Sequence, residues 1–256
     1  MSRRRILVTG AAGAIGRAVR THLLGRGHAV TGLDRGDGPA PWFTGSIQDD
    51  RLVDAAVAGQ ETIIHLAATP DQADFISDLL PNNVGGTYRI LQAALRHGVK
   101  RVVLASTLRT VSLRKRLDRD WIPDEEAEAR PHDEYSLSKV MCEDMGSFFH
   151  YRHGIEVVCA RIGWFLRNPE ESANFLRHAA KSDPQLMNYL SHADCVRFFA
   201  AAAEAPQGRI GFERCFVVSH NAGRSRYPSP NAERAFGWKP TDSYPEGTPA
   251  SVLGHG

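Results

Sequence analysis

A tyrosine and a lysine lie four residues apart in the sequence YSLSK, as Tyr135 and Lys139. On a helix, residues at this spacing share a face, so the phenol and the ammonium group would point to one place. A free phenol titrates at about pH 10, and a neighbouring ammonium group stabilises its ionised form. The pair could take a proton from a substrate hydroxyl while a hydride leaves the same carbon for a nicotinamide. The alternative is an ordinary solvated helix face.

Three glycines, Gly10, Gly13 and Gly16, follow an apolar run in ILVTGAAGAIG, residues 6–16. In a strand-to-helix turn, glycines at this spacing permit a tight bend, admit a pyrophosphate to the backbone and let helix and strand pack closely. The N-terminus of the following helix favours phosphate groups. Glycine-rich turns are common, so the triplet gains weight only from its context.

Asp34 supplies that context, because it ends the second predicted strand 24 residues after Gly10. An acidic residue at about this spacing binds a ribose 2′-hydroxyl, and its charge repels a 2′-phosphate. The sequence therefore predicts NAD as the cofactor rather than NADP. Arg35 and the arginines at 3–5 keep NADP as the alternative, and Asp34 could instead be a solvated turn residue.

Apolar, β-branched runs alternate with amphipathic stretches along most of the chain. The predicted strands are residues 5–9, 29–34, 42–45, 61–66, 101–106, 156–162 and 215–218. The predicted helices are residues 14–26, 49–58, 81–97, 133–153 and 192–203. Short strands without polar alternation indicate a parallel sheet covered on both faces, and right-handed crossovers then give a doubly wound, Rossmann-type α/β fold.

Two segments break this rhythm, residues 168–190 and the tail from residue 221, which is rich in Pro, Ser, Arg and Gly. We therefore expect residues 1–165 to form a dinucleotide-binding Rossmann core. Residues 166–256 should complete the sheet and form a small C-terminal substrate lobe.

The overall composition excludes several classes of protein. The chain has 256 residues, of which 42% are apolar and 23% charged, as in a globular domain. A net charge of +2 is too small to indicate nucleic acid or a membrane surface, and no apolar stretch approaches the ~20 residues that span a bilayer. The start MSRRRILVTG is a poor signal peptide. The four cysteines have no metal-binding spacing, so we expect reduced thiols, no metal and a cytoplasmic protein.

Ordered motifs along the chain add up to a recognisable pattern. They are TGAAGAIG at 9–16, HLAA at 65–68, NVGGT at 83–87, AST at 105–107, YSLSK at 135–139 and ARIG at 160–163. With them the chain resembles the extended short-chain dehydrogenases/reductases, the NAD-dependent epimerase/dehydratase family. The resemblance implies that Thr107 donates a hydrogen bond to the substrate oxygen, that Tyr135 is the base, and that Lys139 activates it and holds the nicotinamide ribose.

The same resemblance implies a set of cofactor contacts. Asn83 would brace the active-site helix, and the backbone at 162–163 would meet the carboxamide. Where the family usually has an acidic residue near the adenine, this chain has Ser46, so Ser46 or the backbone of Ile47 would take that place. The expected cofactor-binding residues are Gly10, Ala12, Gly13, Ala14, Ile15, Gly16, Asp34, Ser46, Ile47, Leu66, Ala67, Ala68, Asn83, Tyr135, Lys139 and Ile162.

Within the family the chain looks closest to the uronate dehydrogenases, which oxidise the anomeric carbon of a sugar acid with NAD. It shares their compact length, LSHADCVRF at 190–198 and GWKP at 237–240. Only residues 140–256 follow the Tyr–Lys pair, which leaves little room for a nucleotide-binding lobe and favours a small substrate. The residues expected to hold that substrate are Thr69, Leu108, Arg109, Trp164 and Arg177, with Arg167 as an alternative to Arg177.

Several of these positions depart from the uronate dehydrogenases. Leu108 and Arg109 replace an Asn–His pair, and Trp164 replaces a serine. Leu108 and Trp164 remove hydrogen-bonding groups, so the substrate could be less polar than a uronate. The basic stretch 108–121 is either a solvated loop or a rim that steers anions, and no aromatic residues are interleaved with its arginines and lysine as in a nucleic-acid site.

We therefore predict an NAD-dependent oxidoreductase that acts on a hydroxyl of a small, sugar-like, anionic substrate. The alternatives are an NAD(P)-dependent sugar epimerase or dehydratase, a secondary-metabolite ketoreductase, and a non-catalytic NAD(P)-binding sensor. The stretches 81–97 and 133–153 resemble the helix pair at the dimer seam of this family, so the resemblance also implies a homodimer.

Overall fold

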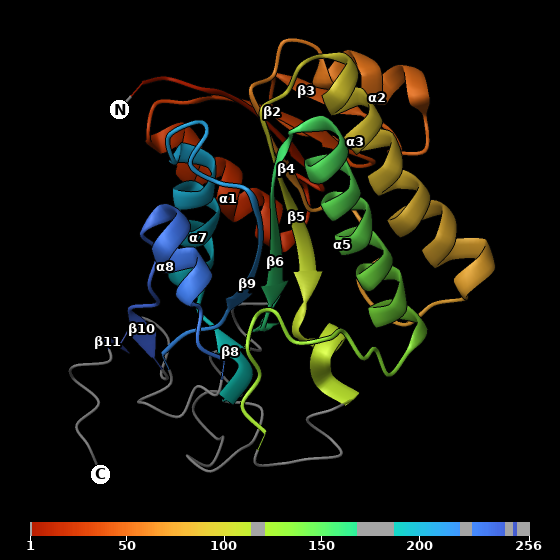
Figure 1. The fold of residues 1–256 in the computed structure, drawn as a ribbon. Helices are drawn as coiled ribbons and strands as arrows, with labels where there is room; N and C mark the ends of the chain where they lie inside the picture. The colour runs from red at the N-terminus through yellow and green to blue at the C-terminus, as the bar shows by residue number, and fades with distance from the viewer. Residues whose placement is uncertain (1, 114–120, 168–186, 221–226, 244–247, 250–256) are drawn as a thin grey trace.

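A seven-stranded parallel sheet forms the centre of the molecule in the computed structural model, which describes residues 2–113, 121–167, 187–220, 227–243 and 248–249 (Figure 1). The strand order is β3-β2-β1-β4-β5-β6-β9. The strands are β1 (Arg5–Thr9), β2 (Ala29–Asp34), β3 (Trp42–Thr44), β4 (Thr62–His65), β5 (Arg101–Thr107), β6 (Glu156–Ile162) and β9 (Phe212–Val217). The order reverses between β1 and β4, which is where ligands bind in sheets of this kind.

Helices cover both faces of the sheet, which explains why its strands are apolar on both sides (Figure 1). Ile6 and Val8 of β1 pack on one face with α1 (Ala14–Gly25), α7 (His192–Glu204) and α8 (Pro230–Phe236). Leu7 points to the other face, toward α2 (Asp50–Val57), α3 (Gly86–Arg96) and α5 (Glu134–His153). The predicted doubly wound α/β class is confirmed.

Helix α5 is fixed at its N-terminus and along its inner face. Asp133 caps it by accepting a hydrogen bond from the backbone N–H of Ser136 at 2.7 Å. Further along, the buried carboxylate of Glu143 accepts hydrogen bonds from Ser106 of β5 at 2.5 Å and from Arg161 of β6 at 2.7 Å. These bonds hold the helix that carries Tyr135 and Lys139 against the two strands beside it.

Irregular elements lie around the carboxyl ends of the strands. A π-helix, η1 (Phe75–Gly85), runs directly into α3, so the helix predicted at 81–97 begins earlier. A 3₁₀ helix, η2 (Leu108–Val111), follows β5. Two small two-stranded sheets pair β7 (Trp164–Phe165) with β8 (Tyr189–Leu190), and β10 (Asp242–Ser243) with β11 (Thr248–Pro249).

The segment beyond residue 165 completes the sheet with β9 and covers it with α7 and α8. Residues 168–186 and 221–226, on which the predicted substrate lobe falls, lie outside the described residues. In the part of the chain that the structure describes, no helix is long and apolar enough to cross a membrane.

Candidate active site

A cleft of about 670 Å³ opens at the carboxyl ends of the central strands, where the strand order reverses. One end is lined by the glycine loop after β1, the end of β2 and the loop after β3. The other end is lined by residues that follow β4, β5 and β6 and by the start of α5. The predicted cofactor-binding residues that line it are Gly10, Ala12, Gly13, Ala14, Ile15, Gly16, Asp34, Ser46, Ile47, Leu66, Ala67, Ala68, Tyr135, Lys139 and Ile162.

The three glycines of the loop serve different purposes. Gly10 has a left-handed φ of 69°, and a Cβ there would lie 2.7 Å from the backbone nitrogen of Ala67. A Cβ on Gly16 would lie 2.1 Å from the carbonyl oxygen of Gly10. Both positions are therefore required by the packing of the protein itself. A Cβ on Gly13 would meet only that same carbonyl oxygen, at 3.1 Å, and would otherwise project into open space.

The space beside Gly13 suits the pyrophosphate of a dinucleotide. Gly13 is the N-cap residue of α1 and has no side chain to cap the first turn, so the helix N-terminus is open to an anion. Gly13 and the residues around it line the cleft. A glycine at this position is thus explained by a ligand that approaches the backbone, and the residues present fit a dinucleotide.

Asp34 is held rigidly at the same end of the cleft. Its Oδ2 accepts a hydrogen bond from the backbone N–H of Ala12 at 2.9 Å, and its Oδ1 accepts one from Gly36 at 3.0 Å. Two backbone donors orient the carboxylate, as binding of a ribose hydroxyl would require. Arg35 lines the cleft next to it.

A buried histidine to which the sequence assigned no role, His65, joins the end of β1 to α3. Burial lowers the pKa of His65 to about 3, with a smaller contribution from the charge of Lys139, so its imidazole is neutral. Its Nδ1 lies 2.7 Å from the hydroxyl of Thr9, and its Nε2 lies 3.1 Å from that of Thr87. The Thr9 hydroxyl also accepts from the backbone N–H of Ala67, which fixes a residue that lines the cleft.

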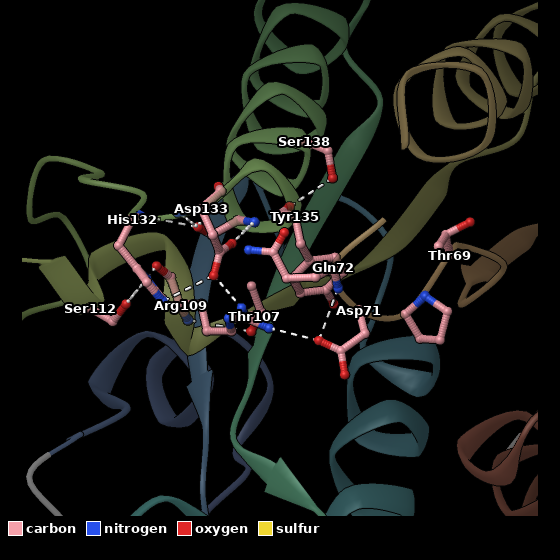
Figure 2. A network of polar contacts seen from close by, with 12 residues as sticks. Thr69, Asp71, Gln72, Thr107, Arg109, Ser112, His132, Asp133, Tyr135 and Ser138 are labelled. Atoms are coloured by element: carbon pink, nitrogen blue, oxygen red, sulfur yellow. Dashed lines mark hydrogen bonds and ion pairs between the residues drawn. The ribbon is translucent and has the colours of Figure 1, made fainter. Parts of the chain in front are cut away.

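Thr107, Tyr135 and Lys139 all line the cleft, and Figure 2 shows the first two near Arg109. Thr107 ends β5, and its Oγ1 accepts a hydrogen bond from the backbone N–H of Arg109 at 3.3 Å. The Lys139 Nζ donates to the carbonyl oxygen of Ala105 at 3.1 Å and lies 5.9 Å from the centre of the Tyr135 ring. The ammonium group is therefore fixed by the strand beside the phenol.

Asn83 does not line the cleft; the neighbouring Asn82 does. The Asn83 side chain is buried, donates to the hydroxyl of Ser138 at 3.0 Å and accepts from the backbone N–H of Thr69 at 2.8 Å. Ser138 in turn donates to the carbonyl oxygen of Tyr135 at 2.7 Å. Asn83 thus joins the loop after β4 to the first turn of α5, an arrangement that suits a bracing role rather than contact with a cofactor.

At the far end of the cleft, Arg109 is the centre of a charged network (Figure 2). Its Nη1 lies 3.1 Å from Oδ1 of Asp71, and its Nη2 forms an ion pair with Asp133. Its guanidinium carbon lies 5.2 Å from the centre of the Tyr135 ring. Partial burial acts to lower the pKa of Arg109, but the two carboxylates outweigh burial and raise it.

The structure places one predicted substrate contact away from the cleft and does not describe another. Leu108 was wrong, because it begins the 3₁₀ helix η2 and turns into the interior, where it packs with Val111, Phe216 and Tyr227. Arg177 lies outside the described residues, as do residues 114–120 of the basic stretch. Thr69, Arg109, Trp164 and Arg167 do line the cleft.

Sequence reasoning missed Asp71 and Phe165, which complete this end of the cleft. Phe165 follows Trp164 in the sequence, so adjacency to that residue was the available signal. Asp71 had no local signal, because only the fold brings it to Arg109. Among the described residues, no group of three or more His, Cys, Asp or Glu side chains is placed to hold a metal ion.

Comparison with known proteins agrees with this geometry. The model of the NAD dependent epimerase/dehydratase family matches residues 6–181. L-arabinose 1-dehydrogenase (NAD(P)(+)) of Haloferax volcanii is 31% identical over 93% of this chain and 97% of its own length. The chain belongs to the NAD-dependent epimerase/dehydratase family, as predicted.

Two solved structures are similar over most of the fold. The glucuronic acid dehydrogenase of Chromohalobacter salexigens superposes with a TM-score of 0.80 at 30% identity, over 94% of this chain and 86% of that one. A uronate dehydrogenase variant of Agrobacterium tumefaciens in complex with NAD superposes with a TM-score of 0.76 at 25% identity, over the same shares of both chains.

Proposed function

We propose that this protein is an NAD-dependent dehydrogenase that oxidises the anomeric hydroxyl of a small sugar acid. The observation that carries the proposal is that Thr107, Tyr135 and Lys139 line the same cleft as the glycine loop. The relatives named above support it, because one is a sugar 1-dehydrogenase and another a glucuronic acid dehydrogenase.

The chain's own residues would hold the cofactor along the cleft. The N-terminus of α1 would bind the pyrophosphate and Asp34 the adenosine ribose, with Ser46 and Ile47 beside the adenine. When bound, NAD supplies the hydride acceptor. NADP is the second candidate, because Arg35 lines this end and the Haloferax relative's name includes both cofactors.

Tyr135 would act as the general base. Its phenolate takes the proton of the anomeric hydroxyl as the C–H bond of the same carbon breaks and a carbonyl forms. The Thr107 hydroxyl donates a hydrogen bond to that oxygen. The Lys139 ammonium, held by the Ala105 carbonyl, stabilises negative charge on the phenol oxygen.

The wall of the substrate end fits a sugar acid. Trp164 and Phe165 offer apolar surface for the C–H bonds of a sugar ring, while Arg109 and Arg167 supply positive charge for an anionic group.

NADH formation on a panel of aldoses and uronates tests this proposal. Steady growth of NADH absorbance with a sugar acid would support the dehydrogenase. NAD that copurifies tightly and never accumulates as NADH would instead indicate an epimerase. Cofactor binding without turnover of any sugar would favour a sensor.

We also propose a cytoplasmic homodimer. Tyr88 of α3 and Phe148 and Tyr151 of α5 are exposed aromatic side chains on the outer pair of helices, which a partner chain would cover. The four cysteines are buried and unpaired, as reduced thiols would be. Light scattering should give about twice the chain mass of 28.2 kDa, and a mass near that of one chain would refute the dimer.

A further inference from the structure

Arg109 is held by two carboxylates that differ greatly in exposure (Figure 2). The side chain of Asp133 is 6% exposed, whereas that of Asp71 is 68% exposed. Arg109 itself is 34% exposed and lines the cleft, so a ligand can reach its guanidinium group from the side of Asp71.

The two ion pairs also differ in how easily they break. Asp133 caps α5, and although burial acts to raise its pKa, the hydrogen bonds from Ser136 and the pair with Arg109 lower it. Pulling Arg109 away would take the guanidinium from a buried carboxylate, which would keep its contacts with His132 Nε2 at 3.0 Å and the Ser136 N–H but lose its arginine, and this is unfavourable. The exposed pair with Asp71 contributes little to stability, and Asp71 would keep its hydrogen bond from the backbone N–H of Gln72 at 3.0 Å.

We propose that Asp71 occupies, on Arg109, the place of the substrate's carboxylate, and that a sugar acid binds by displacing it. Asp133 then keeps the guanidinium in position while the substrate exchanges with Asp71. Because Asp71 is itself a carboxylate, the geometry it adopts on Arg109 is one that a second carboxylate can repeat. This inference rests on the proposed function, since it names the group that selects the sugar acid.

The location of Arg109 supports this role. Its guanidinium carbon lies 5.2 Å from the centre of the Tyr135 ring, so an anion bound to it belongs to the same part of the cleft as the proposed base. A neutral sugar that displaced Asp71 would leave Arg109 without a carboxylate on that side, whereas a sugar acid would replace the carboxylate that is lost. Arg109 and Asp71 together would therefore set the preference for an acid over the matching neutral sugar.

Calorimetric titration of the full chain with NADH present, so that the sugar is not oxidised, using D-galacturonate and D-galactose as probes, tests the exchange. Asp71→Asn removes the competing charge, so the affinity for galacturonate relative to galactose should rise about threefold. In Arg109→Met the affinity for galacturonate relative to galactose should fall by about 10-fold or more. Glu233→Gln is the matched control. It removes an exposed carboxylate on α8 that pairs with Lys239 and lies outside the cleft lining.

Each outcome decides the inference. A ratio of the two dissociation constants that moves in opposite directions in the two variants, and not in the control, supports the exchange. A ratio that stays fixed or moves away from galacturonate in Asp71→Asn overturns it, even if Arg109→Met fails to fold. If sugar acids are oxidised and the ratio of dissociation constants stays unchanged, the proposed function stands and the exchange is wrong. If the ratio shifts as expected and no NADH forms, the exchange stands and the proposed function is wrong. Binding of neither sugar overturns the exchange, and the NADH panel then judges the function separately.

Discussion

The two ends of the cleft are built in different ways. The cofactor end is lined by the backbone of the glycine loop and the N-terminus of α1, with Asp34 as the main charged side chain. The substrate end is lined by side chains from loops after β4, β5 and β6. Proteins that share a fold share its backbone geometry, whereas the side chains of their loops vary from one protein to another. The first end therefore defines the family, and the second distinguishes this chain from its relatives.

The largest expected effect falls where the two ends meet. Tyr135→Phe removes the phenolic oxygen and leaves the ring, so we expect kcat to fall about 1,000-fold, as for loss of a general base. The dissociation constant of NAD should change little, because the phosphates and the adenine bind elsewhere. Stopped-flow measurement of NADH formation checks the first expectation and a fluorescence titration the second.

The matched control for this change is Tyr151→Phe, which lies further along the same helix, outside the cleft lining, and keeps the ring that a partner chain would cover. Full activity in Tyr135→Phe, or an equal loss in Tyr151→Phe, would break the distinction between binding and chemistry.

Two glycines of the same loop separate an effect on stability from an effect on NAD binding. Gly16→Ala forces a Cβ against the Gly10 carbonyl and should lower the free energy of unfolding by about 3 kcal/mol. Gly13→Ala should fold nearly as well as the natural chain but weaken NAD binding about 10-fold. Thermal unfolding and titration with NAD measure the two effects.

Gly25→Ala, at the end of α1 where a Cβ would meet nothing, is the control. If Gly13→Ala bound NAD normally, the open space beside Gly13 would have no connection with the cofactor.

Asp34 should decide which dinucleotide is preferred. Asp34→Asn keeps an acceptor for the backbone N–H of Ala12 but removes the charge that repels a 2′-phosphate. We expect the ratio of kcat/KM for NAD over NADP to fall about 10-fold. Asp37→Asn, a nearby acid outside the cleft lining, should leave the ratio unchanged. An unaltered preference in Asp34→Asn would point to Arg35 or Ser46 instead.

At neutral pH the titration of His65 should have the smallest effect, and it concerns stability rather than activity. Its pKa of about 3 lies below the ordinary value of 6.5, so the unfolded chain binds a proton there that the folded chain excludes. The free energy of unfolding should therefore fall as pH drops below about 6.5, by up to about 1.4 kcal/mol per pH unit. In His65→Gln this part of the slope should disappear in urea titrations between pH 4 and 6.5, and an unchanged slope would assign it to other groups.

The sequence predicts the regular elements well, because hydrophobic periodicity and caps are local. The bounds of β1, β2 and β6 agree with the predicted ranges. Strand β9 begins earlier than predicted, since Glu213 and Arg214 interrupt the apolar run and pair with Arg234 and Glu143 only in the folded chain. Helix α8 escaped notice, although Pro230 in its first turn and Gly237 after its end are the expected signals.

The site divides in the same way. The glycine loop and the Tyr–Lys pair follow from spacing, so their positions were predictable. Leu108 was misplaced because a short 3₁₀ turn reverses which side chain faces the cleft. The pairing of Asp71 with Arg109 joins residues from two loops, and no local pattern records it.

The central claim is that one cleft holds both the hydride acceptor and the base. A sugar acid labelled with deuterium at its anomeric carbon tests it most directly, with the NADH formed analysed by mass spectrometry. We predict that the NADH carries the deuterium and that labelled substrate reacts more slowly than unlabelled substrate. NADH without deuterium, or a labelled sugar that is converted with no NADH at all, would contradict the account.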